Sequence, residues 1–143
     1  MIFPDVNMLL YAYDRNSTLH LEAKQWLEET LSDNEVFFSW QTITGFLRIL
    51  THPGILKNPA PLSEAVQVVS DWLERDNTHL VAFGKRNWPL FSRMLLESQA
   101  TGNLVMDAHV AAMTVSCGAT VASTDRDFTR FPGLQFTNPI AKT

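Results

Sequence analysis

The sequence predicts an α/β fold with a central, mainly parallel sheet flanked by helices. Short β-prone runs alternate along the chain with longer stretches whose apolar residues keep helical spacing. Strands separated by helices are typical of βαβ units, in which a helix carries the chain between parallel strands. The 143 residues fit one compact domain, and no repeat, low-complexity tract or linker divides them. We therefore expect a single domain over residues 1–143.

The expected elements follow from apolar spacing and from residues that start or break helices. Between residues 40 and 50, Ile43, Phe46 and Leu50 recur at helical intervals. Asn87-Trp88-Pro89 has the cap and the proline of a helix start. The expected helices cover 6–13, 19–31, 40–50, 62–73, 88–95 and 105–115, and the expected strands cover 2–5, 35–39, 119–123 and 134–136.

Composition and charge exclude several classes of protein. The single cysteine, Cys117, rules out an internal disulfide framework or a cysteine zinc site and is compatible with a reducing compartment. No apolar run approaches the roughly 20 residues of a membrane-spanning helix. The net charge of −4 argues against a sequence-blind electrostatic grip on nucleic acid. We expect a cytoplasmic protein outside membranes, in which metal ions or clustered arginines would hold any phosphate ligand.

Acidic residues fall where a parallel sheet places its ligand sites. Ligands bind just outside the carboxyl ends of such strands. Asp5 lies at the end of the first expected strand, and Asp125 follows the strand that ends at Ser123. Asp107 falls in the first turn of the helix before that strand. If the two strands are neighbours, these carboxylates meet at one rim of the sheet.

Carboxylates that meet in this way would hold a divalent cation. Like charges at close range stay ionised only when a cation or hydrogen bonds compensate them. Hard oxygen ligands suit Mg²⁺ or Mn²⁺ better than zinc, and such ions activate water for phosphodiester displacement. Each residue also has a plainer interpretation: Asp5 as a helix N-cap, Asp107 as a complement to its helix dipole, and Asp125 as a turn residue.

The same residues carry a family resemblance that runs over nearly the whole chain. The sequence resembles the PIN-domain ribonucleases, specifically the VapC toxins of bacterial toxin–antitoxin pairs. The motifs that carry it are Asp5-Val-Asn7-Met-Leu-Leu-Tyr-Ala12, Ser39-Trp40, Phe46-Leu-Arg48-Ile, Thr51-His-Pro53, Gly102-Asn103-Leu-Val-Met-Asp107-Ala-His109, Ser123-Thr-Asp125-Arg-Asp127-Phe and Phe131-Pro132-Gly133. Each motif is weak alone, but their common order and spacing are specific.

The resemblance implies an endoribonuclease that depends on Mg²⁺ or Mn²⁺ and hydrolyses structured RNA of the tRNA or rRNA class. It also implies a homodimer that is silenced by a VapB-type antitoxin. Asp5 and Asp107 would be the principal metal ligands, with Asp125 as a weaker third that acts through water. Asn7 would support Asp5, and Thr124 would help to orient the acidic edge.

One position departs from the family pattern. VapC-like proteins often carry a glutamate directly before the hydrophobic pair that here is Phe46-Leu47, whereas this chain has Gly45. Glycine offers no ligand, so we expect a competent site for one metal, with a second ion weakly held or brought by the RNA phosphate. Polar side chains on the same helix would partly substitute for the glutamate through a water: Gln41, Thr42 or Thr44.

Basic residues near the expected rim are candidates for contacts with RNA phosphates. Arg48 lies on the same expected helix as Gly45, and Arg126 and Arg130 flank the acidic edge. Guanidinium groups suit this task because they bind phosphate oxygens in a bidentate fashion. We therefore expect these arginines to contact RNA.

The tryptophans and one histidine have structural interpretations. Trp26, Trp72 and Trp88 fall on apolar faces, so we expect them to pack in the core rather than stack on bases. Trp40 is the exception, because it starts the helix nearest the expected site. His109 lies on a different azimuth of its helix from Asp107, so we expect a packing role rather than a general base.

Two other functions are compatible with these residues. A phosphatase of the haloacid-dehalogenase type also places its nucleophile where Asp5 lies, but it normally has a second aspartate where this chain has Asn7. The second is a non-catalytic binding module that lost activity with Gly45 and acts through its partner. The apolar helices at 19–31 and 40–50 would suit burial against an antitoxin helix or a second protomer.

Overall fold

Short parallel strands form the centre of the molecule in a computed structural model that describes residues 1–141. The 5-stranded sheet has the order β3-β2-β1-β4-β5, and every neighbouring pair is parallel. The strands are β1 (Ile2–Pro4), β2 (Val36–Phe38), β3 (Thr78–Leu80), β4 (Thr120–Ala122) and β5 (Gln135–Thr137). The parallel sheet predicted from the sequence is therefore confirmed.

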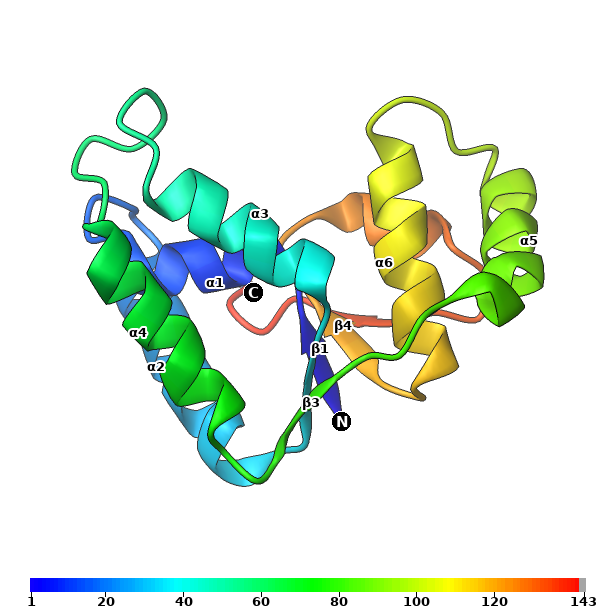
Figure 1. The fold of residues 1–143 in the computed structure, drawn as a ribbon. Helices are drawn as coiled ribbons and strands as arrows, with labels where there is room; N and C mark the ends of the chain where they lie inside the picture. Colours follow the sequence, from blue (N-terminus) through cyan, green and yellow to red (C-terminus); the bar gives the residue numbers. More distant parts are fainter. Residues whose placement is uncertain (142–143) are drawn as a thin grey trace.

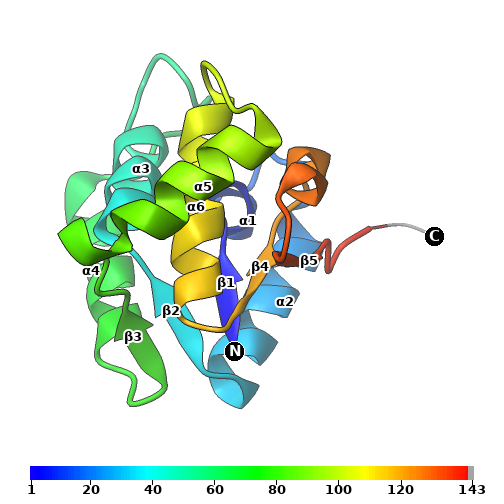
Figure 2. The same ribbon diagram turned by 90° about the vertical axis from the view of Figure 1, so that its right-hand side faces the viewer.

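Helices cover both faces of this sheet, as Figure 1 and Figure 2 show. They are α1 (Val6–Tyr13), α2 (His20–Asp33), α3 (Trp40–Leu50), α4 (Leu62–Leu73), α5 (Trp88–Ser98) and α6 (Leu104–Ser116), with short 3-10 helices η1 (Lys85–Asn87) and η2 (Arg126–Arg130). One buried apolar cluster joins α1, α2, α3 and α4 to β2, and another joins α5 and α6 to β1 and β4. Within residues 1–141, no helix has the length and apolar character needed to cross a membrane.

The strand order opens a crevice at the carboxyl ends of β1 and β4. The chain runs from β1 to β2 and β3 on one side of the sheet, then returns to β4 and β5 on the other. Pro4 at the end of β1 pairs with Ala122 at the end of β4. Asp5 and Ser123 therefore leave the sheet side by side, and the Asp5 amide donates to the Ala122 carbonyl at 2.9 Å. In open parallel sheets, ligands bind at such a reversal of strand order.

The structure differs from the sequence-based expectations at two places. Strand β3 was not expected, because a strand of 3 residues is too short to show alternation, and as an edge strand it leaves Leu80 40% exposed. Trp72 packs in the core as predicted, stacked on Phe38 with ring centroids 5.0 Å apart. The prediction for Trp88 was wrong: it begins α5, touches Phe91 only edge-on, and is 57% exposed.

Candidate metal centre

Asp5 connects the end of β1 to the start of α1. Its Oδ1 accepts a hydrogen bond from the Val6 amide at 2.9 Å, so the residue caps α1, as its plainer interpretation predicted. Its Oδ2 accepts a second hydrogen bond, from the Ser123 hydroxyl at 2.8 Å. Burial raises the pKa of the Asp5 carboxyl above its ordinary value, although both hydrogen bonds oppose the shift. The same carboxylate thus caps a helix and faces the crevice.

Ser123, directly after β4, holds the acidic edge together. Its side chain is fully buried, and its hydroxyl donates to Asp5 while accepting from the Asn7 amide at 3.1 Å and from the Asp125 backbone N–H at 3.0 Å. Asn7 also donates to the Thr124 hydroxyl at 3.1 Å. The supporting positions predicted for Asn7 and Thr124 therefore lie in one network. Ser123 was not predicted as a site residue, although it ends a buried strand and begins the Ser123-Thr-Asp125-Arg-Asp127-Phe motif.

Three further carboxylates gather beside this network. Asp107 lies in the first turn of α6, and Asp125 caps η2 and accepts from the Asp127 backbone N–H at 2.9 Å. One carboxylate oxygen from each of Asp107, Asp125 and Asp127 lies within 4.8 Å of the other two. Asp127 was not predicted as a site residue, although it belongs to the Ser123-Thr-Asp125-Arg-Asp127-Phe motif.

Burial and like charge both act on Asp107. Burial, followed by the charges of Asp125, Asp5 and Asp127, raises the pKa of the Asp107 carboxyl to about 6. Asp5 lies outside the trio of close oxygens, but its charge is among those that act on Asp107. These acidic side chains therefore meet at one rim, although 102 positions separate Asp5 from Asp107 along the chain.

The residues present fit a hard divalent cation. Asp107, Asp125 and Asp127 offer carboxylate oxygens close enough to bind one ion together, and such ligands are typical of Mg²⁺ and Mn²⁺ sites. A cation would also relieve the like-charge repulsion that, in addition to burial, raises the pKa of Asp107. Asp5 lines the pocket beside these carboxylates, and its Oδ2 atom is held by the Ser123 hydroxyl.

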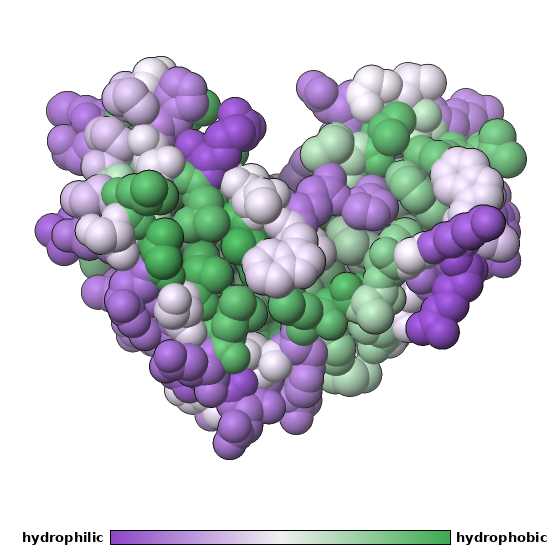
Figure 3. All heavy atoms as spheres, in the orientation of Figure 1, coloured by the Kyte–Doolittle hydropathy of each residue, from purple (hydrophilic) through white to green (hydrophobic). Residues whose placement is uncertain are grey.

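A pocket of about 210 Å³ opens next to the carboxylates, between the start of α1, the length of α3 and the start of α6. Asp5 lines it from the end of β1 and Asp107 from the first turn of α6, and Gln41, Gly45 and Arg48 line it from α3. Figure 3 shows that the molecule is hollowed between its two halves in this region, with hydrophilic residues at the floor of the hollow. A ligand that bridges the two halves would therefore meet both the acids and α3.

Gln41, Thr42 and Thr44, the side chains expected to substitute for a glutamate at position 45, differ in their burial and in their hydrogen bonds. Gln41 lines the pocket and binds the ring of His109 on α6, and its amide also reaches the sulfur of Met106 at 3.5 Å. Thr42 is buried and lines the pocket, whereas the Thr44 hydroxyl donates to the Gln41 backbone carbonyl at 3.1 Å. Gln41 therefore ties α3 to α6 across the site.

The packing role predicted for His109 agrees with its surroundings. Its ring lies between Phe83 and Phe91, with centroids 5.2 and 5.0 Å away. Burial lowers the pKa of the imidazole below its ordinary value, which keeps the ring neutral. Its hydrogen bond with Gln41 then fixes the orientation of the Gln41 amide beside the pocket.

The predicted RNA-binding arginines are spread around the site. Arg48 lines the pocket, and Arg126 begins η2 directly after Asp125, exposed to solvent. The Arg130 guanidinium donates to the Ser98 carbonyl at 3.4 Å, next to the end of α5. Of these arginines, Arg48 alone lines the same pocket as the acids.

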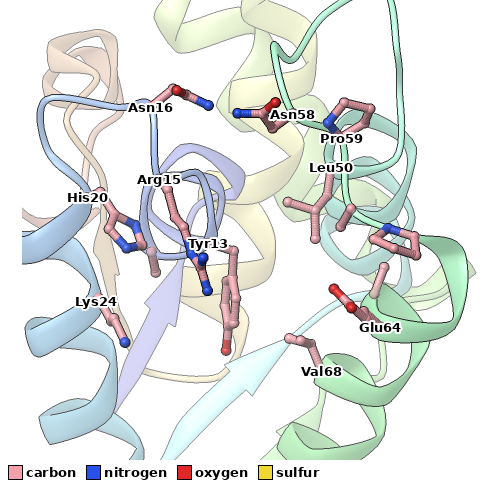
Figure 4. Close-up of a pocket in the computed structure, with 14 residues that line it drawn as sticks. Tyr13, Arg15, Asn16, His20, Lys24, Leu50, Asn58, Pro59, Glu64 and Val68 are labelled. Carbon is pink, nitrogen blue, oxygen red and sulfur yellow. The ribbon is translucent and has the colours of Figure 1, made fainter.

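A larger hollow of about 600 Å³ lies away from the carboxylates (Figure 4). It is formed by the corner between α1 and α2 on one side and by α4 with its preceding loop on the other. Its lining includes the basic residues Arg15 and Lys24 but none of the clustered aspartates. Glu64 is the one carboxylate among its lining residues, so it offers a single acidic ligand for a metal.

The fold and the acidic rim define the class of protein. The family model for the PIN domain matches residues 2–134, so the chain is a PIN-domain protein. Ribonuclease VapC37 of Mycobacterium tuberculosis is 37% identical over 138 residues, which cover 96% of this chain and 96% of that protein. Ribonuclease VapC33 of the same species is 32% identical over 98% of this chain and 99% of its own length. The chain belongs to the VapC family of PIN-domain proteins.

Solved structures support the same fold. The VapBC2 complex of Rickettsia felis, bound to a DNA fragment from its promoter, contains a chain that superimposes with a TM-score of 0.67 at 18% identity. The match covers 96% of this chain and 98% of that one. FitAB bound to a DNA fragment gives a TM-score of 0.71 at 16% identity, covering 97% and 95% of the two chains. The resemblance found in the sequence is therefore confirmed.

Replacement of Ser123 by alanine should destabilise the protein. The change removes the partner of the Asp5 carboxylate and of the Asp125 amide in a fully buried place, at a cost of about 1–3 kcal/mol. Urea unfolding measures the loss. Ser32→Ala is the matched control, because the Ser32 hydroxyl is exposed on α2 and donates only to the Glu28 carbonyl. Equal midpoints for the two variants would show that the Ser123 network does not support the rim.

Replacement of Asp107 by asparagine should stabilise the metal-free protein at neutral pH. A carboxyl whose pKa is raised from 3.8 to about 6 on folding binds more protons in the folded state, so its contribution to the free energy of unfolding falls as pH rises across that window. Asp107→Asn has no carboxyl to ionise, so its free energy of unfolding does not fall for this reason as the pH rises. Thermal unfolding in chelator should show a higher Tm than wild type at pH 7 and little difference below pH 4.

The control for that comparison is Asp76→Asn, because Asp76 is exposed in the turn between α4 and β3. Its Tm should follow the wild-type pH dependence. If Asp107→Asn follows it as well, neither burial nor the charges of the neighbouring carboxylates raise the pKa of Asp107.

Proposed function

We propose that the protein is a magnesium-dependent endoribonuclease, the toxin of a type II (VapBC) toxin–antitoxin pair, which hydrolyses phosphodiesters of tRNA or rRNA. The observation that carries this proposal is the meeting of Asp107, Asp125 and Asp127 within 4.8 Å at the crevice of a VapC-family fold, with Asp5 beside them. Relatives over nearly the full length of the chain are named ribonucleases.

The aspartates would hold the ion and position the attacking water. Mg²⁺, or Mn²⁺ in its place, would lower the pKa of a bound water and stabilise charge on the phosphate. Asp5 and Asp107 act as the principal ligands, and Asp125 acts as a weaker one. The Ser123 hydroxyl keeps Asp5 turned toward the crevice, and the Asn7 amide holds that hydroxyl and the Thr124 hydroxyl in place. Asp107 would have to lose its proton to serve as a ligand of the ion.

Partners of the protein follow from its family and from its surface. Solved complexes with the same fold are titled VapBC and toxin–antitoxin complexes, which supports a VapB-type antitoxin as the partner. Large apolar side chains stay exposed, among them Trp40 at 62%, Trp88 at 57% and Met106 at 56%. Such side chains suit burial in a homodimer. A cytoplasmic location is part of the proposal, because an RNA substrate and a VapB-type antitoxin would both be met there.

A non-catalytic binding module remains the second candidate, because Gly45 leaves the α3 wall of the pocket without a carboxylate. The phosphatase alternative has less support. The residue two positions after Asp5 is an amide, and both of its partners are hydroxyl groups of the rim. Asn7 therefore acts in holding the rim and offers no acid for a phosphatase mechanism.

The nuclease activity should depend on a divalent ion and on both Asp5 and Asp107. The test incubates partner-free protein with total tRNA and rRNA in Mg²⁺ or in chelator. Asp5→Asn and Asp107→Asn should each lower the cleavage rate by at least about 100-fold, since each removes a charged ligand of the ion. Asp76→Asn serves as the control and should cleave like wild type.

Cleavage that persists in chelator, or in the Asp5 and Asp107 variants, would contradict the metal mechanism. If partner-free wild type leaves RNA intact in Mg²⁺ but still binds its antitoxin, the binding-module function replaces the nuclease.

A further inference from the structure

The α3 wall of the pocket combines a position without a side chain, Gly45, with an arginine, Arg48. Gln41, Gly45 and Arg48 follow one another at helical spacing and line the same pocket as Asp5 and Asp107. Of the residues that line it, Arg48 alone is basic. The pocket thus has an acidic wall at the sheet edge and a basic residue on the helix opposite.

Arg48 is available to a ligand. Its side chain is exposed, and within residues 1–141 neither a hydrogen bond nor an ion pair engages its guanidinium. It shares the pocket with Asp5 and Asp107 yet lies beyond 4.0 Å from their oxygens. A guanidinium in this position can hold an anion whose other oxygens reach toward the acids and their cation.

Gly45 keeps Arg48 unpaired. An added Cβ at Gly45 would meet the Val6 side chain at 3.4 Å, which is ordinary contact, and no positive φ requires glycine there. The position could therefore accept a larger side chain. An acid at position 45 would stand three residues before Arg48 on one helix face, the spacing at which opposite charges pair. Glycine leaves that pair unformed and the pocket open.

We propose that Arg48, with the space left by Gly45, forms the phosphate-binding subsite for the RNA strand on the α3 side of the pocket. The inference rests on the proposed nuclease function and deepens it. The guanidinium binds the non-bridging oxygens of a phosphodiester and offsets charge on the α3 wall, where no carboxylate is present to hold a second metal ion. An acidic protein of net charge −4 thereby gains a specific contact with a polyanion.

The test measures RNA binding without cleavage. The full chain with Asp5→Asn and Asp107→Asn is titrated against a short fluorescein-labelled single-stranded RNA of mixed sequence, in chelator, over a range of salt concentrations. Adding Arg48→Gln should weaken binding by about ten-fold and reduce the slope of log affinity against log salt by about one, as the loss of one phosphate contact requires. Arg48→Lys should restore the slope but only part of the affinity.

Two further variants sharpen the comparison. Arg93→Gln is the control, because Arg93 is exposed on α5 and lies 3.9 Å from Glu97 in a loose i,i+4 pair outside the pocket. It should leave affinity and slope unchanged. Gly45→Glu should weaken RNA binding by about as much as Arg48→Gln, because the new carboxylate would pair with Arg48.

The proposal is overturned if the protein binds RNA equally well with and without Arg48→Gln, or if neither form binds RNA detectably. Tighter RNA binding by Gly45→Glu would also overturn it. This failure is distinct from failure of the nuclease function. If Arg48→Gln alone, in an otherwise wild-type protein, cleaves RNA at an unchanged rate, the nuclease function is retained and the phosphate-binding subsite is excluded. Absence of cleavage by wild type would remove the nuclease function itself.

Discussion

Repulsion between carboxylates at the crevice is the constraint around which the site is built. Two parallel strands end side by side, and the residues after them bring Asp5 and Asp125 to the same edge that α6 reaches with Asp107. Burial and mutual charge then push the pKa of Asp107 to about 6. A fold that only needed stability would avoid this arrangement, whereas a site that binds a divalent cation requires it.

Uncharged hydrogen-bond donors hold the rim, and within residues 1–141 no ion pair involves its aspartates. The buried Ser123 hydroxyl joins Asp5, Asn7 and the backbone of Asp125, so the end of β4 and the start of α1 keep a fixed relation. On the opposite wall, Gln41 joins α3 to α6 through His109, whose neutral ring is packed between aromatic side chains. Basic partners near the acids would compete with a cation. Their absence among these contacts leaves the negative charge for the metal.

Much of the fold and part of the site could be predicted from the sequence. Apolar periodicity, together with residues that start or end helices, was sufficient for the helices, and the place of Asp5 and Asp107 at expected element ends anticipated that they would share a rim. Ser123 and Asp127 could not be assigned. Whether a serine after a strand is buried and bonded, or an aspartate in a turn faces its neighbours, depends on which strands pair. Strand β3 and the exposure of Trp88 likewise depend on tertiary packing.

The α3 wall shows how a site can change while its rim stays the same. The acids are set by strand ends and by the first turn of α6, so their positions depend on the sheet. The residues of α3 reach the pocket from a helix that faces it, and a substitution there alters charge without disturbing the rim. Position 45 is an example, because a Cβ added at Gly45 would make only an ordinary van der Waals contact, with the Val6 side chain.

Calorimetric titration of the metal-free protein with MnCl₂ and MgCl₂, in buffers of different ionisation enthalpy, measures whether the clustered carboxylates bind a divalent ion. We expect saturable binding of one divalent ion that releases about half a proton at pH 6 and much less at pH 8, because Asp107 must lose its proton to bind the ion. Absence of saturable binding, or binding whose proton release is the same at both pH values, would contradict it.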